Sequence, residues 1–240
     1  MSDIQFSSEM TVKLVRSMAS DDMVIQAAQV SAKGENNPET VPERLVRALL
    51  VGRHGSPFEH TAFTFFVEAP LFVFREWQRH RISSFNEMSG RYTELKPKFY
   101  IPDFDRAIIN DGTKMKPSFT FDWDIDANKH DTRRHKWARG SLRSVSRSAW
   151  RQYESMLELG IANEVARMVL PLNVYSQMYW TVNARSLMNF LSLRVESDDS
   201  LVRSYPQFEI DQAAQKVEAI FAEAMPATYA AFVKNGRVAP

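Results

Sequence analysis

The segment from Arg79 to Tyr92 constrains this chain more than any other, because it is too polar to be buried and too specialised for ordinary surface. Within its fourteen residues are three arginines and one histidine, three serines, one asparagine and one glutamate. Burying unpaired charge is very costly, and the segment lacks the Lys/Glu mixture of a merely solvated face. Arginine presents a planar set of donors that suits phosphate oxygens. We therefore interpret the segment as part of a pocket for an anionic, hydrogen-bonding ligand.

Composition narrows the possible functions. The 240 residues carry a net charge of +1, which demands neither a nucleic acid nor a membrane surface as partner. The chain has no cysteine, so disulfides, thiolate metal sites and a thiol nucleophile are excluded. No basic region followed by an apolar run is present near the N-terminus, and no apolar stretch is long enough to span a bilayer. We therefore expect a cytoplasmic protein.

Hydrophobic periodicity and turn residues predict an α+β fold. We expect a single domain, residues 1–240, in which a central sheet of short strands packs with long helices. The predicted strands are residues 11–16, 61–68, 98–101 and 174–182. The predicted helices are residues 21–33, 43–50, 72–81, 134–159, 162–170, 184–195 and 209–224. Residues 34–38, His54–Pro57 and 83–92 are predicted as loops or turns, and residues 103–133 as an insertion or long loop.

Three details of the helices are specific enough to test. Asp21 or Asp22 is expected to cap the first helix. The helix at 134–159 is predicted to bury a stripe formed by Leu142, Val145, Ala149, Tyr153 and Met156. Its arginines recur every fourth residue on another face, at Arg139, Arg143, Arg147 and Arg151.

The stretch from Asn183 to Arg194 is a second candidate for chemistry. Asn183 is positioned to cap the helix, and Arg185 and Asn189 are four residues apart, so that one helix face presents both. Arg194 lies about half a turn round the helix from Arg185. Such a helix can serve two pockets, or one pocket shared between subunits. The alternative is an ordinary amphipathic helix whose apolar residues fill the core.

Several single residues in these segments have more than one interpretation. Basic residues at 79–81 can clamp an anion, or they can cap the negative end of a helix. Glu87 can pair with a nearby arginine or accept hydrogen bonds from a ligand. A nucleophilic role for Ser89 is disfavoured, because no base, orienting group or Gly-x-Ser-x-Gly turn accompanies it. The spacing of the histidines fits no compact metal-ligand pattern, so we expect no metal site.

The polar segment also matches a known motif position for position. The motif reads Arg-His-Arg, two free positions, Ser, one free, Asn-Glu, one free, Ser, one free, Arg-Tyr, and every fixed position is filled between Arg79 and Tyr92. The chain thus resembles the flavin-dependent thymidylate synthases, and Glu164–Arg167 and Thr181–Phe190 resemble them as well. The resemblance extends from about Gly52 to Arg194, interrupted at 103–133. A cysteine-dependent thymidylate synthase is excluded, because the chain has no cysteine.

The resemblance implies an FAD-binding homotetramer whose active sites are shared between subunits. Residues implied to contact the flavin are Ser56, Arg79, His80, Arg81, Glu87, Asn183, Ala184, Arg185 and Asn189. Residues implied to contact deoxyuridine monophosphate (dUMP) are Trp77, Gln78, Arg79, Glu87, Met88, Ser89, Gly90, Arg91, Arg167 and Arg194. Among these, Arg194 is the implied catalytic residue, which would lie against the uracil and favour its ionised form. Glu76 stands where we expect glutamine in the family, and a carboxylate there would turn away from the nucleotide phosphate or pair with an arginine.

The implied reaction is reductive methylation of dUMP to thymidylate (dTMP). Methylenetetrahydrofolate supplies the one-carbon unit, NADPH reduces the flavin, the flavin delivers hydride, and no covalent enzyme nucleophile is used. One rival interpretation is a nucleic-acid-binding module, because Lys129–Arg151 holds eight Lys/Arg and one acid. Its weakness is the small net charge, which leaves no domain-wide basic surface. Another rival is a structural oligomer without catalysis. We expect the enzyme, with no nucleic-acid or membrane partner.

Overall fold

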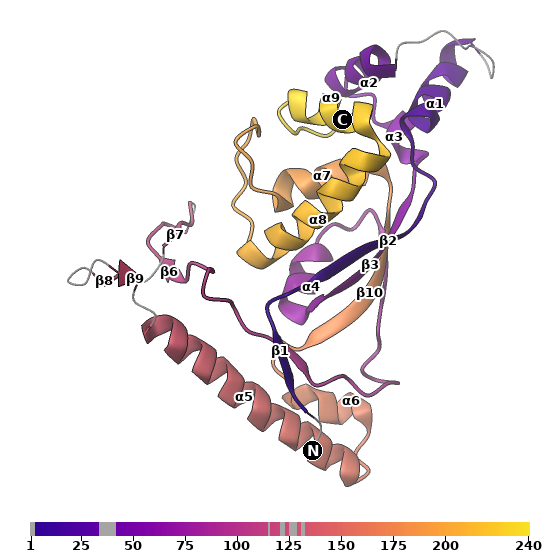
Figure 1. The fold of residues 1–240 in the computed structure, drawn as a ribbon. Helices are drawn as coiled ribbons and strands as arrows, with labels where there is room; N and C mark the ends of the chain where they lie inside the picture. Colours follow the sequence, from indigo (N-terminus) through magenta and orange to yellow (C-terminus); the bar gives the residue numbers. More distant parts are fainter. Residues whose placement is uncertain (1–2, 34–41, 115, 121–122, 125–128, 131–132) are drawn as a thin grey trace. The chain divides into compact units, whose positions relative to one another are not determined.

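The computed structural model describes residues 3–33, 42–114, 116–120, 123–124, 129–130 and 133–240, and their α+β class is the predicted one (Figure 1). The helices are α1 (Asp21–Lys33), α2 (Pro42–Val51), α3 (Ser56–Glu59), α4 (Leu71–Trp77), α5 (Arg133–Glu158), α6 (Asn163–Ala166), α7 (Ala184–Arg194), α8 (Phe208–Ala224) and α9 (Pro226–Lys234), with a 3-10 turn η1 (Arg167–Val169). The strands are β1 (Gln5–Ser7), β2 (Thr11–Ser17), β3 (Phe63–Pro70), β4 (Ser84–Glu87), β5 (Lys98–Tyr100), β6 (Ile109–Asn110), β7 (Phe119–Thr120), β8 (Trp123–Asp124), β9 (Lys129–His130) and β10 (Tyr175–Val182). The loop predicted at 34–38 lies outside the described residues.

The chain forms two compact units. Unit 1 comprises Met1–Met10, Glu68–Arg75 and Glu87–Gln177, and unit 2 comprises Thr11–Val67, Glu76–Asn86 and Met178–Pro240. The single domain with an insertion at 103–133 stays a prediction. In the described part of that region, two pairs of very short antiparallel strands form, β6 with β7 and β8 with β9.

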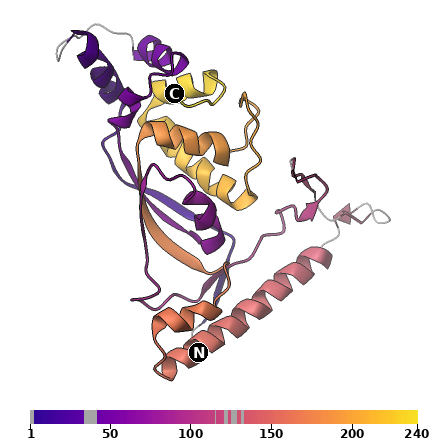
Figure 2. The same cartoon turned by 180° about the vertical axis from the view of Figure 1, so that it is seen from behind.

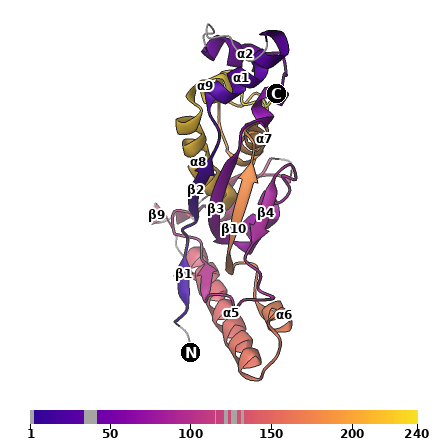
Figure 3. The same ribbon diagram turned by 90° about the vertical axis from the view of Figure 1, so that its right-hand side faces the viewer.

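Unit 2 is built on a four-stranded sheet in the order β2-β3-β10-β4, whose strands lie side by side in Figure 3. Helices α7 and α8 cover one of its faces. The β3 strand alternates buried and half-buried residues, and the strand's Phe63 ring meets Phe221 of α8 edge to face at 6.0 Å. The Trp180 ring of β10 lies between Phe65 and Phe190, 5.4 Å and 4.9 Å from their centroids. This aromatic core fixes α7 against the sheet.

Unit 1 contains the long helix α5, with α6 beside it (Figure 2). Strand β1 pairs in parallel with β5, Phe6 opposite Phe99. Phe99, Trp150 and Tyr153 are buried together, and the Trp150 ring meets Phe99 edge to face. These contacts explain why a helix with such a charged sequence is stable: one face is packed on aromatic rings.

The secondary structure around the motif differs from the prediction. The helix predicted to reach Arg81 ends at Trp77, since the backbone N–H groups of Arg79 and His80 bond three residues back, to Glu76 and Trp77. The segment predicted as a loop from 83 to 92 begins with strand β4, which adds to the edge of the sheet beside β10. Its polar sequence hid this strand, because pairing with β10 rather than strand propensity decides it. Similarly, the predicted turn at His54–Pro57 already contains the start of α3 at Ser56.

The predicted apolar stripe of α5 is partly wrong. Leu142 and Val145 are 36% and 58% exposed, whereas Ser146 is fully buried and accepts a hydrogen bond from Asn173 at 3.1 Å. The sequence pattern did not identify the buried face of α5, because that face contains a polar residue, Ser146. Its burial depends on its bond to Asn173, which belongs to another part of the chain. The arginines on the helix pack on aromatic rings instead, Arg143 and Arg147 over Phe6.

Helix capping also shows one difference from prediction. Ser20, not Asp21 or Asp22, caps α1, through a 3.1 Å bond from the Met23 N–H. The Asp21 carboxylate instead accepts the N–H groups of Ala227 and Thr228 at the start of α9, at 2.8 and 2.9 Å. One helix thus supplies the cap of another that lies about two hundred residues away in sequence.

Candidate active site

Arg194, the last residue of α7, is held in place by residues from the end of α4 and the turn after it. Its Nη1 donates to Glu76 Oε2 at 2.8 Å, and its Nη2 donates to the Glu76 backbone oxygen at 3.3 Å. Its Nε donates to His80 Nε2 at 3.1 Å. All three nitrogens of the guanidinium are therefore bonded to protein, and the side chain is 19% exposed. The group is fixed, yet it keeps an open side.

The electrostatics of this cluster agree with its geometry. Burial, together with the cationic Arg194 beside it, lowers the pKa of His80 to about 4. His80 is therefore neutral near pH 7, and its Nε2 can accept the Arg194 N–H. Burial also raises the pKa of the Glu76 carboxyl; Arg194 opposes this shift and the buried Glu209 adds to it. Arg194 is thus a cation paired with a half-buried carboxyl group and bonded to a neutral imidazole.

An aromatic wall supports the cluster. The His80 ring meets Phe190 edge to face at 4.9 Å, and Phe190 in turn lies 4.9 Å from Trp77. Trp77, predicted to contact the nucleotide, has no exposed surface, and the structure gives its indole a packing role. Its contact with a nucleotide stays a prediction. Gln78 lies in the turn after α4.

The opposite side of α7 carries a second cluster, as the half-turn between Arg185 and Arg194 predicts. Arg185 donates from Nη1 to Glu59 Oε1 at 2.5 Å and from Nε to the Pro240 backbone oxygen at 2.9 Å. It crosses over Gly55, where a Cβ would lie only 2.5 Å from Arg185 Nε, so that any larger residue here would displace this side chain. Ser56 is exposed at the start of α3 next to this glycine.

The start of α7 is tied down by its own polar residues. Asn183 caps the helix as predicted, accepting the Ser186 N–H at 2.9 Å. The buried Ala184 donates its N–H to Thr61 Oγ1 at 2.9 Å. Asn189 is exposed beside Arg185, and its Nδ2 donates to the Arg185 backbone oxygen at 3.2 Å. Phe190 and Leu191 are fully buried, so α7 is at once the predicted amphipathic core helix and the carrier of two polar clusters.

Unit 2 carries further donors besides those of the two clusters. Arg79 and Arg81 flank His80, and both are exposed. With Ser56, Arg185 and Asn189 they make a set of cationic and neutral donors that suits a flavin dinucleotide, which presents a pyrophosphate and ring carbonyls. These residues therefore fit the group that the sequence resemblance implies.

The motif residues from Glu87 onward belong to unit 1. Gly90 is buried, and a Cβ there would lie 3.4 Å from Arg167 Cδ, so that the loop packs closely on that arginine. Arg91 pairs through Nε with Glu164 at 2.6 Å. The Ser89 hydroxyl accepts the Arg91 N–H at 3.3 Å, and the Met88 N–H bonds to Gln177 of β10. Arg167 thus lies against Gly90, the residue before Arg91, and both arginines are of a type suited to a phosphate; Glu87 at the end of β4 is exposed.

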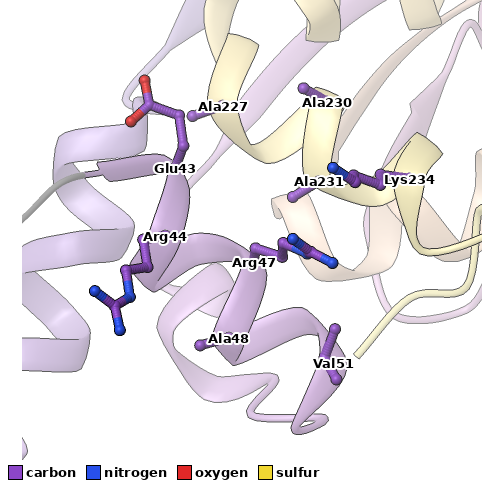
Figure 4. A pocket seen from close by; sticks show the side chains of 9 residues that line it. All are labelled: Glu43, Arg44, Arg47, Ala48, Val51, Ala227, Ala230, Ala231 and Lys234. Atoms are coloured by element: carbon purple, nitrogen blue, oxygen red, sulfur yellow. The ribbon is translucent and has the colours of Figure 1, made fainter.

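A large cavity in unit 2 lies apart from all the predicted site residues. Its volume is about 630 Å³, and it lies between α2 and α9 (Figure 4). Glu43, Arg47 and Lys234 line it together with alanines, and no motif residue does. We do not place the chemistry there. Among the described residues, no helix has the length and apolar character of a membrane span, and no cluster of three or more His, Asp or Glu residues offers a metal site.

Comparison with known proteins decides the family. Residues 13–227 match the family model described as "Thymidylate synthase complementing protein". The flavin-dependent thymidylate synthase of Streptomyces coelicolor is 47% identical over 99% of this chain and 96% of its own. The chain belongs to the flavin-dependent thymidylate synthase family. It is therefore a member of a family of flavin-dependent methyltransferases.

Other members extend this finding. The flavin-dependent thymidylate synthase of Tropheryma whipplei (strain TW08/27) is 46% identical over 99% of this chain and 98% of its own. In structure, the chain is similar to the UMP/dUMP methylase PolB from Streptomyces cacaoi bound with 5-Br UMP, with a TM-score of 0.90 and 41% identity over 99% of both chains. The same methylase bound with 5-Br dUMP gives a TM-score of 0.88.

The sequence interpretation missed the partners that hold the family's arginines. Glu59 and Glu164 were not predicted as partners, and Glu76 was expected to turn away or to pair with an arginine that the sequence did not specify. No local signal marks such residues, because each pairs with a side chain from a different element. The only sign in the sequence that an arginine would have a partner was Glu76, an acidic residue just before the cationic residues 79–81.

The lowered pKa of His80 predicts a pH effect on stability. Because the unfolded histidine takes up a proton at a pH where the folded one does not, we expect the free energy of unfolding to fall as the pH drops from 6.5 towards about 4. Urea titrations at several pH values in this range would measure it. His80→Gln should flatten the pH dependence, whereas His54→Gln, at an exposed site, should leave it unchanged. Equal slopes in wild type and His80→Gln would contradict the assignment.

Proposed function

We propose that this chain converts dUMP to dTMP, with methylenetetrahydrofolate as one-carbon donor, FAD as flavin and NADPH as reductant. The observation that carries the proposal is the fixed Arg194 guanidinium, bonded through all three nitrogens and still partly exposed. A cation held in this way needs no reorganisation when negative charge develops on a neighbouring ring. The family of the chain supports the same reaction.

The proposed site residues form two groups, one that would contact the nucleotide and one that would contact the flavin. In unit 1, Ser89, Gly90, Arg91 and Arg167 would hold a nucleotide phosphate, and Glu87 would contact the flavin. In unit 2, Arg194 would lie against a uracil and favour its ionised form. The residues of unit 2 that would hold the dinucleotide are Ser56, Arg79, His80, Arg81, Asn183, Ala184, Arg185 and Asn189. When bound, FAD contributes the delivery of a hydride derived from NADPH.

Local hydrogen bonds support a reaction without an enzyme nucleophile. The Ser89 hydroxyl accepts the N–H of Arg91, and the Ser89 backbone oxygen accepts those of Tyr92 and Thr93. No histidine or carboxylate is bonded to this hydroxyl in the described part of the chain, whereas a nucleophilic serine requires such a base. Ser89 is thus suited to contact the ligand and poorly suited to attack it.

A homotetramer with shared active sites is part of the proposal because the sequence resembles this family. Ile82, Tyr92 and Met168, which follow Arg81, Arg91 and Arg167 in sequence, are 77%, 76% and 76% exposed. Single exposed apolar residues are common on protein surfaces, so these exposures agree with the assembly without carrying it. Light scattering on the purified protein tests this assembly, and a monomer that still turns over would contradict shared sites.

Uridine monophosphate is a second candidate substrate, favoured by the likeness to a UMP/dUMP methylase at 41% identity over nearly the whole chain. A side-by-side assay decides between the two nucleotides. The protein, loaded with FAD, is supplied with NADPH, methylenetetrahydrofolate and either dUMP or UMP, each tritiated at C5. We expect flavin absorption that bleaches with NADPH, and tritium release mainly from dUMP. Equal release from UMP would change the proposed substrate, and no release from either would overturn the proposed function.

A further inference from the structure

Glu76 contributes two acceptors to one guanidinium. Its carboxylate accepts from Arg194 Nη1 at 2.8 Å, and its backbone oxygen accepts from Nη2 at 3.3 Å. Both atoms belong to one residue near the end of α4, so the position of Arg194 is tied to that helix end. His80, four residues later, accepts from Nε. These three hydrogen bonds of the guanidinium therefore all go to one short segment, residues 76–80.

These hydrogen bonds leave two N–H groups of the guanidinium available to bind a ligand. Each terminal nitrogen of arginine carries a second N–H, and among the described residues no acceptor bonds to that second N–H in Arg194. The side chains of Arg194 and Glu76 are 19% and 28% exposed, so the cluster lies at the surface of the core and not inside it. We propose that Glu76 is the positioning residue of this enzyme, which holds Arg194 so that its remaining N–H groups face the nucleotide. The proposal rests on the proposed function of Arg194.

The chemistry of Glu76 explains why a carboxylate is suited to this place. A hydrogen bond between ions is about twice as strong as a neutral one, and so the carboxylate fixes the guanidinium more firmly than an amide would. The charge of this carboxylate is engaged by Arg194, which lessens the repulsion that it would exert on a nucleotide phosphate. The expectation that Glu76 pairs with an arginine thus holds for the catalytic arginine itself.

A merely structural carboxylate and a direct nucleotide contact make different predictions. A positioning residue affects turnover through Arg194, a structural residue affects stability, and a nucleotide contact affects affinity. The test therefore compares Glu76→Ala, Glu76→Gln, Arg194→Ala and the double variant Glu76→Ala with Arg194→Ala. The matched control is Glu196→Gln, which breaks an exposed Glu–Arg pair (2.7 Å to Arg203) two residues beyond Arg194.

For Glu76→Ala we expect kcat to fall by about 10²-fold, the loss typical of a misplaced catalytic group, with dUMP affinity and flavin content changed by less than about threefold. Glu76→Gln should recover most of this loss, because its amide oxygen still accepts, and Glu196→Gln should behave as wild type. In the Arg194→Ala background, Glu76→Ala should cost nothing further, since residues that act as a unit are not additive. The proposal would be overturned if the kcat losses of the two single variants multiplied in the double variant. It would also be overturned if Glu76→Ala raised the Kd for dUMP and left kcat unchanged.

A second measurement needs no activity and keeps this test separate from that of the proposed function. In ¹⁵N NMR spectra, the Arg194 Nε–H bonded to His80 should give a slowly exchanging signal that is absent from Arg194→Ala. Glu76→Ala should speed its exchange, because the guanidinium loses its one ionic anchor, the carboxylate on Nη1, and keeps only the bonds to the backbone oxygen of residue 76 and to His80. If that signal is unaffected by Glu76→Ala, Glu76 does not position Arg194, whatever the protein catalyses. If the signal responds but wild type shows no turnover, only the proposed function fails.

Discussion

Arg194→Ala should lower dTMP formation by about 10²- to 10³-fold while FAD stays bound, the loss typical of removing one preorganised donor. The reason is that Arg194 is the fixed cation proposed to face the uracil, while the proposed flavin contact on the same helix, Arg185, lies half a turn away and is held by Glu59 and Pro240. Tritium release from dUMP measures turnover, and the flavin spectrum after gel filtration measures retention.

Two variants sharpen this prediction. Arg194→Lys keeps the positive charge but not the planar set of donors, so we expect it to remain well below wild type. Arg203→Ala removes an arginine from an exposed ion pair in the same unit and should leave turnover unchanged. Normal turnover in Arg194→Ala would mean that the activating residue is another one. Loss of flavin together with activity would mean that Arg194 serves the cofactor.

Phe190→Ala should destabilise the protein by about 3–5 kcal/mol, the usual cost of removing a buried aromatic side chain. Phe190 has no exposed surface and meets Trp77, Trp180 and His80, each at a ring-centroid distance of 4.9 Å. The cavity would thus open at the junction of the α7 helix, the sheet and the Arg194 cluster. Urea unfolding followed by tryptophan fluorescence measures the loss.

Residues on the same helix provide the comparison. Leu193→Ala, at a residue that is 55% exposed, should cost less than about 1 kcal/mol. Phe190→Leu should lose less stability than Phe190→Ala, because it keeps most of the apolar volume. If Phe190→Ala and Leu193→Ala were equally stable, the aromatic cluster would not be the core of this unit.

Much of the fold followed from local patterns. The helices α1, α2, α7 and α8 and the strands β2 and β10 occur close to their predicted bounds, because each is long and strongly patterned or has a clear start signal, such as the Asn183 cap of α7. Strand β4 and the end of α4 were not predictable in this way. There, pairing with β10 and tight backbone bonds at Glu76 and Trp77 outweigh local propensity.

The candidate site likewise has features that local sequence predicts and features that only tertiary contacts decide. Residue types and spacing in the chain were enough to identify the family and the two opposite faces of α7 and to propose the donors, because motifs and helical period are local properties. Only the folded protein shows that Arg194 is bonded to Glu76 and His80, which precede it by 118 and 114 positions. Such a pairing depends on where the sheet and the aromatic core bring two helix ends, and no short stretch of sequence encodes that meeting.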